Sequence, residues 1–366
     1  MIDLSKVFAV FLGLSVPSLF LNIQAQTAKL YVGTYTSAGG SEGAQLYDFE
    51  ATTGASTFLG TIPMDNPSFL ARKGQMLYAV NENNEGSVTA IDLESRAIMG
   101  TLPTKGAHPC HVSLSPTKPV LVVSNYSSGS LVLFSLKDDG SLNQEEDFIQ
   151  FEGSSINKDR QSSSHIHSAF FSADGSRLFV SDLGADLIYI YEIQQKGARY
   201  SFHRIDSISA PKGSGPRHVV ISDDAKCIYS VLELTGELAV FQQKNNQWVN
   251  AQVLPIYNKG FKGEHGAADI KMSPDGKFVY ATNRGDANVI ACYEVMKDKT
   301  LRVKSIVSTG GNSPRNLNIS ADGRWAFVTN QISNQITVFK RNKRTGALHI
   351  DESATIPVSK PVCLIF

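Results

Sequence analysis

A single strand pattern recurs seven times along this chain at a nearly constant interval. The copies are KLYVGTY, MLYAVNE, VLVVSNY, RLFVSDL, CIYSVLE, FVYATNR and WAFVTNQ. Counted at Thr34, Glu82, Tyr126, Leu183, Glu233, Arg284 and Gln331, they are separated by 48, 44, 57, 50, 51 and 47 residues. No amphipathic helical stretch stands out between them. A period near fifty residues in an all-β sequence predicts a β-propeller, in which each blade is a small antiparallel sheet.

A second recurring strand precedes this one and shows how the ring closes. Its copies are NPSFLA, HPCHVSL, HIHSAFF, GPRHVVI, GAADIKM, SPRNLNI and, as the last seven residues, KPVCLIF. The last copy has no strand after it, whereas KLYVGTY has no such strand before it. Turns such as SADGS and SPDGK join the two strands elsewhere, and Asp-Gly favours a tight turn. We therefore expect a seven-bladed β-propeller over residues 26–366, closed by pairing of the N-terminal and C-terminal strands.

The N-terminus has the pattern of an export signal. Lys6 precedes the apolar run of residues 7–21, and the run is followed by a plausible cleavage site after Ala25. The run is short and contains Pro17, which disfavours a membrane-spanning helix. We expect residues 1–25 to be a signal peptide and the mature chain to be periplasmic or extracellular without a transmembrane anchor; an uncleaved anchor is the alternative.

The net charge, the cysteines and the absence of certain motifs limit which partners, disulfides and cofactors are expected. Lys and Arg number 34, as do Asp and Glu, so the formal net charge is zero and a nucleic-acid partner is not expected. The four cysteines, Cys110, Cys227, Cys292 and Cys363, lie in predicted strands without paired spacing. We expect buried free thiols, although export makes a disulfide the alternative. No glycine-rich phosphate loop, serine elbow or Cys-x-x-Cys pair is present, so no cofactor or metal is expected.

Polar residues are expected at one end of the propeller axis. The inner strand of each blade lines the axis, and residues equidistant from a hairpin turn lie opposite each other. A spacing of 16 residues places Arg217 opposite Glu233, with both at the open end of the hairpin. The same reasoning places at this end His167, Arg217, Arg315, Glu233, Arg284, Glu82, Gln331 and Tyr126. Because each blade contributes a different residue, the set suits a single asymmetric ligand.

Each of these residues also has a structural interpretation. Arg217 and Glu233 could form a cross-strand ion pair that only supports the fold, and Arg315 could hold the loop carbonyls of a neighbouring blade. His165 and His218 could lie behind the site, since strand alternation turns them away from their neighbours. His111 is expected in the core. The series Asn81, Asn125, Asp182, Asn283 and Asn330 is expected to cap turns, with a divalent-metal cage as the alternative.

The motifs HPCHVSLSP, HIHSAFFSADG, GSGPRHVVIS with VLE, and SPDGKFVYATNRGDANV resemble those of the lactonase family of seven-bladed propellers. That family includes propeller-type 6-phosphogluconolactonases and carboxy-muconate lactonizing enzymes, and the resemblance covers the whole mature chain. It implies catalytic residues at His167, Arg217, Glu233 and Arg284. Our interpretation adds substrate contacts from Glu82, Tyr126, His165, His218, Arg315 and Gln331.

The expected reaction is hydrolysis of a sugar lactone. Glu233 or His167 would activate water, although Arg217 should lower the pKa of Glu233 and weaken it as a base. Arg217 and Arg284 would stabilise the oxyanion or bind an anionic group of the substrate. Export favours an unphosphorylated lactone over a sugar phosphate. Two alternatives stay open: a non-enzymatic surface or adhesion propeller, and a cycloisomerase acting on a muconate-type lactone.

Overall fold

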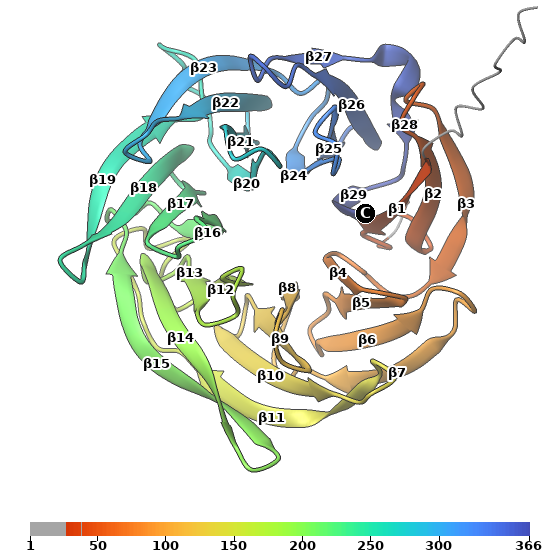
Figure 1. Cartoon of the computed structure of the whole chain (residues 1–366), viewed down its shortest axis with the longest axis vertical. Helices are drawn as coiled ribbons and strands as arrows, with labels where there is room; N and C mark the ends of the chain where they lie inside the picture. Colours follow the sequence, from red (N-terminus) through yellow and green to blue (C-terminus); the bar gives the residue numbers. More distant parts are fainter. Residues whose placement is uncertain (1–26, 38) are drawn as a thin grey trace, which may run out of the picture.

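The computed structural model describes residues 27–37 and 39–366, and these form seven antiparallel sheets arranged in a ring (Figure 1). The predicted all-β, seven-bladed propeller is therefore confirmed. The proposed signal peptide, residues 1–25, lies outside the described residues. Among the residues described, no helix is long and apolar enough to cross a membrane.

The blades follow chain order except where the two ends of the chain meet, and each runs from its innermost strand outward. Blade 1 is β29 (Pro361–Ile365), β1 (Thr27–Thr34), β2 (Gly43–Glu50) and β3 (Ser56–Pro63). Blades 2 to 4 are β4 (Leu70–Lys73), β5 (Met76–Asn81), β6 (Ser87–Asp92) and β7 (Ile98–Pro103); β8 (Pro109–Leu114), β9 (Val120–Asn125), β10 (Ser130–Leu136) and β11 (Leu142–Gln150); and β12 (Ile166–Phe171), β13 (Leu178–Asp182), β14 (Leu187–Lys196) and β15 (Arg199–Ser209). Blades 5 to 7 are β16 (Pro216–Ile221), β17 (Cys227–Leu232), β18 (Glu237–Lys244) and β19 (Gln247–Pro255); β20 (Ala267–Met272), β21 (Phe278–Asn283), β22 (Val289–Val295) and β23 (Leu301–Ser308); and β24 (Pro314–Ile319), β25 (Trp325–Asn330), β26 (Gln335–Arg341), β27 (Leu348–Ile350) and β28 (Ile356–Pro357), with the short 3₁₀-helix η1 (Glu352–Ala354) between the last two.

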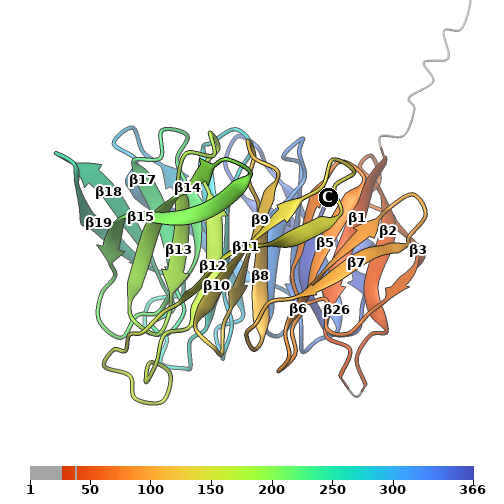
Figure 2. The ribbon, with the colours of Figure 1, turned by 90° about the horizontal axis from the view of Figure 1, so that it is seen from below.

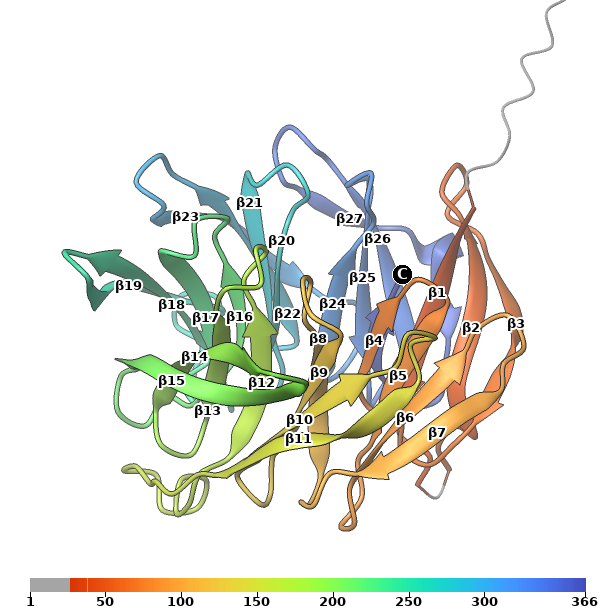
Figure 3. The same ribbon diagram turned by 60° about the horizontal axis from the view of Figure 1, so that its bottom comes forward.

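The inner strands run along the propeller axis, as the side view shows for β8 and β12 (Figure 2). Figure 3 shows the outer strands β11 and β15 lying at a steep angle to them. This is the accumulated twist of a four-stranded sheet, which follows from the right-handed twist of each strand. The twist keeps neighbouring blades in face-to-face contact, so their apolar side chains form a core between every pair of blades.

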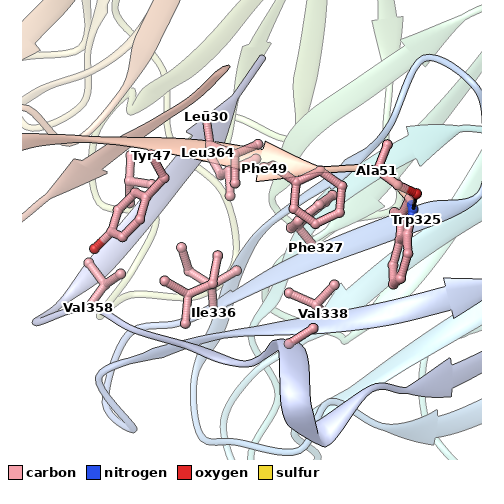
Figure 4. Close-up of a cluster of buried hydrophobic side chains, with 13 residues drawn as sticks. Leu30, Tyr47, Phe49, Ala51, Trp325, Phe327, Ile336, Val338, Val358 and Leu364 are labelled. Carbon is pink, nitrogen blue, oxygen red and sulfur yellow. Dashed lines mark hydrogen bonds between the residues drawn. The ribbon is translucent and has the colours of Figure 1, made fainter. Parts of the chain in front are cut away.

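The ring closes between the two ends of the chain, as predicted. Strand β1 pairs with β29 in antiparallel register, with Val32 opposite Leu364. Blade 1 then packs against blade 7 through a buried apolar cluster that includes Phe49 and Phe327, whose ring centroids are 4.9 Å apart (Figure 4). At the edge of the cluster, Trp325 Nε1 donates a hydrogen bond to Ala51 O (2.9 Å). The closing strand thus contributes both hydrogen bonds and part of this core.

The hairpin turns have the backbone conformation that their sequences predict. Gly175, Gly276 and Gly323 adopt positive φ angles of 68°, 68° and 70°, a conformation that costs glycine little because it has no Cβ. In the degenerate turn SDDAK, Ala225 occupies the corresponding position with φ 51°. These turns lie at the end of the axis opposite to the polar residues considered below.

A β-bulge interrupts the inner strand of six blades at the polar end of the axis. In blade 5 the pairing shifts between Pro216 and Val219, and equivalent shifts occur in β8, β12, β20, β24 and β29. The expectation that Arg217 lies directly opposite Glu233 is therefore wrong in register. The Glu233 N–H donates to Gly215 O (2.8 Å), so Gly215 is its cross-strand neighbour. A bulge re-aims the side chain of its extra residue, and Arg217 reaches Glu233 from this position.

All four cysteines are buried and free, which confirms the expected thiols. His111 is buried in the core as expected, between Phe69 and Phe170. The Asn and Asp series caps loops between blades. Asn125 Nδ2 donates to Thr104 O (3.0 Å), and Asp182 Oδ1 accepts the N–H of His165 (2.9 Å). The turn-capping interpretation is therefore confirmed for these residues.

Candidate active site

Glu233, the residue after β17, is the centre of a group of charged side chains contributed by three blades. Arg217 Nε lies 2.9 Å and Arg284 Nη2 3.0 Å from Glu233 Oε2. His167 Nε2, from β12, lies 3.9 Å from the same oxygen. The four residues expected to be catalytic are thus together. We call them, with Arg160 described below, the Glu233 cluster.

The two inner arginines are fixed by the backbone of blade 6. Arg217 Nη1 donates to Ala268 O in β20, and Arg284 Nε donates to Gly266 O (2.9 Å) just before that strand. Their side chains are 3% and 16% exposed. Because each guanidinium binds both a carbonyl and the carboxylate, its position is set before any ligand arrives.

Burial and the arginines act on Glu233 in opposite directions. Burial alone would raise the pKa of its carboxyl, but Arg284, Arg217 and Arg160 together outweigh burial and lower the pKa to about 2. The carboxylate is therefore ionised at any ordinary pH and is a weak base. Burial, with Glu233 acting against it, lowers the pKa of Arg284 to about 10, so this guanidinium is still charged at neutral pH.

Within the cluster, His167 is buried in a cationic environment. Burial lowers the pKa of its imidazole well below the usual value, and the charges of Arg217, Arg315 and Arg284 lower it further. The ring is therefore neutral at pH 7 and has a nitrogen free to accept a proton. Its Nδ1 lies 3.9 Å from Cys110 Sγ, and burial raises the pKa of that thiol, so Cys110 is uncharged.

His218 lies behind Arg217 rather than at the surface of the cluster. Its Nδ1 is 2.8 Å from Asp269 Oδ1, and its Nε2 is 3.5 Å from Arg217 Nη1. It is 2% exposed, and Asp269 is fully buried. Asp269 also accepts hydrogen bonds from Asn316 Nδ2 (2.6 Å) and the Leu317 N–H (2.9 Å). His218 thus contacts the guanidinium that binds Glu233 and links it to this buried carboxylate.

A second polar group joins blades 7, 1 and 2 at the same end of the axis. Arg315 Nη2 donates to the Tyr35 hydroxyl (2.8 Å), which in turn donates to the Glu82 carboxylate (3.0 Å). All three side chains are partly exposed. Arg315 therefore binds a tyrosine of the neighbouring blade rather than loop carbonyls. These three hydrogen-bonded side chains present a cation, a hydroxyl and a carboxylate side by side, a set suited to a polyhydroxy ligand.

The remaining expected residues lie at the edge of the site. The rings of Tyr126 and His165 stack with centroids 4.6 Å apart, and Tyr126 meets the His167 ring edge-on at 5.4 Å. His165 Nδ1 is 3.1 Å from Tyr126 O. Gln331 follows β25, and its N–H donates to Ser313 O (3.0 Å). Among the described residues no hydrogen bond links the Gln331 side chain to the Glu233 cluster.

Three residues of the site are absent from the sequence-based set. Tyr35 is the last residue of KLYVGTY and so corresponds to Glu82 in MLYAVNE; counting that repeat at Thr34 missed it. Arg160 lies in the loop between β11 and β12, where the interval of 57 residues between repeats signals an insertion. Asp269 had no signal beyond its position in β20.

Arg160 reaches the cluster from outside the blades. Its Nη2 donates to Glu233 Oε1 (2.7 Å) and to the Tyr126 hydroxyl (3.1 Å), and its side chain is 44% exposed. With Arg217, Arg284 and Arg315 it makes four guanidinium groups against the carboxylates of Glu233 and Glu82. This end of the axis is therefore net cationic although the whole chain is neutral. Within residues 27–37 and 39–366, no group of three or more His, Cys, Asp or Glu side chains could hold a metal ion.

Fixed guanidinium groups in a water-poor site are suited to stabilising an oxyanion, and a neutral imidazole beside a carboxylate can accept a proton. The arrangement therefore suits the chemistry of hydrolysis. The model of the family described as "Lactonase, 7-bladed beta-propeller" matches residues 29–366. The chain belongs to this lactonase family, which confirms the resemblance and the class of enzyme inferred from the sequence.

Individual relatives agree with this assignment. A protein of Formosa agariphila named 6-phosphogluconolactonase is 33% identical over 334 residues, which cover 87% of this chain and 94% of the relative. A 6-phosphogluconolactonase of Bacillus subtilis is 29% identical over 349 residues, 92% of this chain and 97% of the relative. The solved structure of the Pseudomonas aeruginosa periplasmic gluconolactonase has a TM-score of 0.83 and 32% identity, and the match covers 93% of this chain and 99% of that one.

Proposed function

We propose that this protein hydrolyses the 1,5-lactone of a sugar acid, with unphosphorylated gluconolactone as the preferred substrate. The observation that supports it most is the Glu233 cluster, in which fixed arginines and a neutral histidine from three blades surround one carboxylate. Opening a lactone requires these elements: a proton acceptor for water, cations for the oxyanion, and a proton for the leaving ring oxygen.

In the proposed mechanism His167 takes a proton from water as the water oxygen attacks the lactone carbonyl carbon. The carboxylate of Glu233, 3.9 Å from Nε2, stabilises the imidazolium that forms. Arg284, the more exposed of the two fixed arginines, stabilises the tetrahedral oxyanion. When the ring C–O bond breaks, His167 returns the proton to the alkoxide, which leaves a hydroxyl group and a carboxylic acid; the acid then ionises to a carboxylate and releases its proton to solvent. We assign the base to His167 because both carboxylate oxygens of Glu233 contact arginines, whereas a neutral imidazole has a ring nitrogen that can accept a proton.

The polar group of Glu82, Tyr35 and Arg315 would bind substrate hydroxyls, and the stacked Tyr126 and His165 rings would form an edge of the site. Gln331 is a further candidate contact at this end of the axis. His218 would act at a distance by holding Arg217, which is the role its contacts support.

We also propose that residues 1–25 are removed as a signal peptide and that the propeller of residues 26–366 acts outside the cytoplasm. The charged and apolar pattern before Ala25 supports this, as does the similarity to a periplasmic gluconolactonase. Export supports an unphosphorylated substrate, because sugar phosphates are cytoplasmic.

Acid release in a pH-stat tests the proposal. The mature protein is offered glucono-1,5-lactone and its 6-phosphate, and spontaneous opening is subtracted. We expect catalysis to favour the unphosphorylated lactone and to be lost in His167→Gln, while His203→Gln in the outer strand β15 keeps full activity. No acceleration of either lactone would reject the proposed function, and preference for the 6-phosphate would reject the substrate assignment.

A further inference from the structure

The Glu233 cluster is almost closed to solvent. The side chains of Glu233, His167 and Arg217 are 9%, 7% and 3% exposed. Both carboxylate oxygens are occupied, because Oε2 contacts Arg217 and Arg284 whereas Oε1 accepts the hydrogen bond of Arg160. A lactone that is to hydrogen-bond with Glu233 must therefore compete with these arginines for the carboxylate oxygens.

Arg160 is the arginine of the cluster whose side chain is free to move away from Glu233. Arg217 and Arg284 are also bound to backbone carbonyls of blade 6. Arg160 instead has a side chain that is 44% exposed, and among the described residues its guanidinium donates hydrogen bonds to side-chain oxygens alone, those of Glu233 and Tyr126. Its withdrawal leaves the other two arginines in place on Glu233.

The backbone that carries Arg160 is fixed, so the motion is confined to the side chain. Gln161 is fully buried, and its Nε2 donates to Leu183 O (2.9 Å) and Asp186 Oδ1 (2.8 Å) in blade 4. The Arg160 N–H donates to Asn157 Oδ1 (3.2 Å), and Ser155 Oγ donates to Asp186 Oδ2 (2.5 Å). The loop thus holds the Arg160 Cα in place beside the site, within reach of both Glu233 and an incoming ligand.

We propose that Arg160 is a substrate-displaced latch: in the free protein it closes the Glu233 cluster, and it leaves Glu233 Oε1 to donate its hydrogen bonds to oxygen atoms of the entering polyhydroxy lactone. Arg160 is then a specificity-determining residue that exchanges a carboxylate partner for a ligand partner. This inference rests on the proposed function, since it names how the same site admits its substrate.

The first test is a crystal structure of the mature protein with the δ-lactam of gluconic acid, a neutral analogue that resists hydrolysis. We expect the lactam beside His167 and Glu233, with the Arg160 guanidinium bonded to the ligand and no longer within 3.5 Å of Glu233 Oε1. A lactam bound in the cluster with the Arg160–Glu233 bond intact would overturn the latch and leave the proposed function standing. A lactam that does not bind would count against both the latch and the proposed function.

Kinetics supply the second test. Arg160→Met should raise KM for gluconolactone about tenfold, because the lost charge-assisted hydrogen bonds to the ligand outweigh the contact with Glu233 that no longer has to be broken, and change kcat less than threefold. Arg160→Lys should recover part of the loss. Lys158→Met, an equal change of charge at an exposed residue of the same loop, is the matched control and should leave KM within twofold. An unchanged KM in Arg160→Met, or a fall confined to kcat, would contradict the proposal.

Discussion

Replacing Glu233 by Gln should destabilise the protein at neutral pH although the two side chains have nearly the same shape. Removing a charge from an active site often stabilises a fold, but here the carboxylate is the counter-ion of buried Arg217 and Arg284. The amide of Gln would present an N–H group to guanidinium groups that are themselves only donors. Removing one partner of a buried ion pair typically costs about 3–5 kcal/mol.

The lowered pKa of Glu233 leads to a similar value for the loss in free energy of unfolding. A fall from the usual 4.5 to about 2 corresponds to roughly 3 kcal/mol of stability at pH 7. With an unfolding entropy of about 2.1 cal/mol/K per residue over roughly 340 residues, this predicts a Tm about 4 °C below the wild type. Because the folded-state pKa is lowered, the contribution is present above pH 4.5 and is lost as the pH falls towards 2. The difference in Tm between the two proteins should therefore shrink over that range.

Differential scanning calorimetry of wild type and Glu233→Gln between pH 7 and pH 3 measures this difference. The control is Glu294→Gln, which breaks an exposed ion pair with Arg302 (2.5 Å) and should not change Tm measurably. If Glu233→Gln has the same Tm as wild type at pH 7, or a higher one, the arginines are not held by this carboxylate. A difference in Tm that does not change with pH would show that the ionisation of Glu233 does not contribute to stability.

Other predictions follow from the site and from the ring. Arg284→Ala should lower kcat by about a hundredfold, as for the loss of one oxyanion donor; a fall of less than tenfold in steady-state assays would remove Arg284 from that role. Deleting residues 361–366 removes β29 and should prevent folding, seen as loss of the cooperative transition in circular dichroism. A reducing agent should leave Tm unchanged, because all four cysteines are free; a lower Tm would indicate a disulfide.

Much of the architecture could be predicted because it repeats. Seven copies of each strand fixed the number of blades, and an unpaired copy at each end of the chain required β1 and β29 to pair. Asp-Gly turns at Gly175, Gly276 and Gly323 marked the closed end of three of the hairpins. The polar residues at the open end could then be assigned to one end of the axis, which is why His167, Arg217, Glu233 and Arg284 were found together.

What the repeats could not give is how each side chain is aimed. The bulge between Pro216 and Val219 changes the register, and only the folded ring shows that Arg217 still reaches Glu233. Arg160 lies in an insertion that makes its loop longer than the corresponding loops of other blades, so the repeat says nothing of its direction, and Asp269 becomes a partner of His218 only when blades 5 and 6 pack. Strand order and turn chemistry are local properties that a sequence records directly. The electrostatics of Glu233 depend on distances between blades and on burial, and these exist only once the ring has closed.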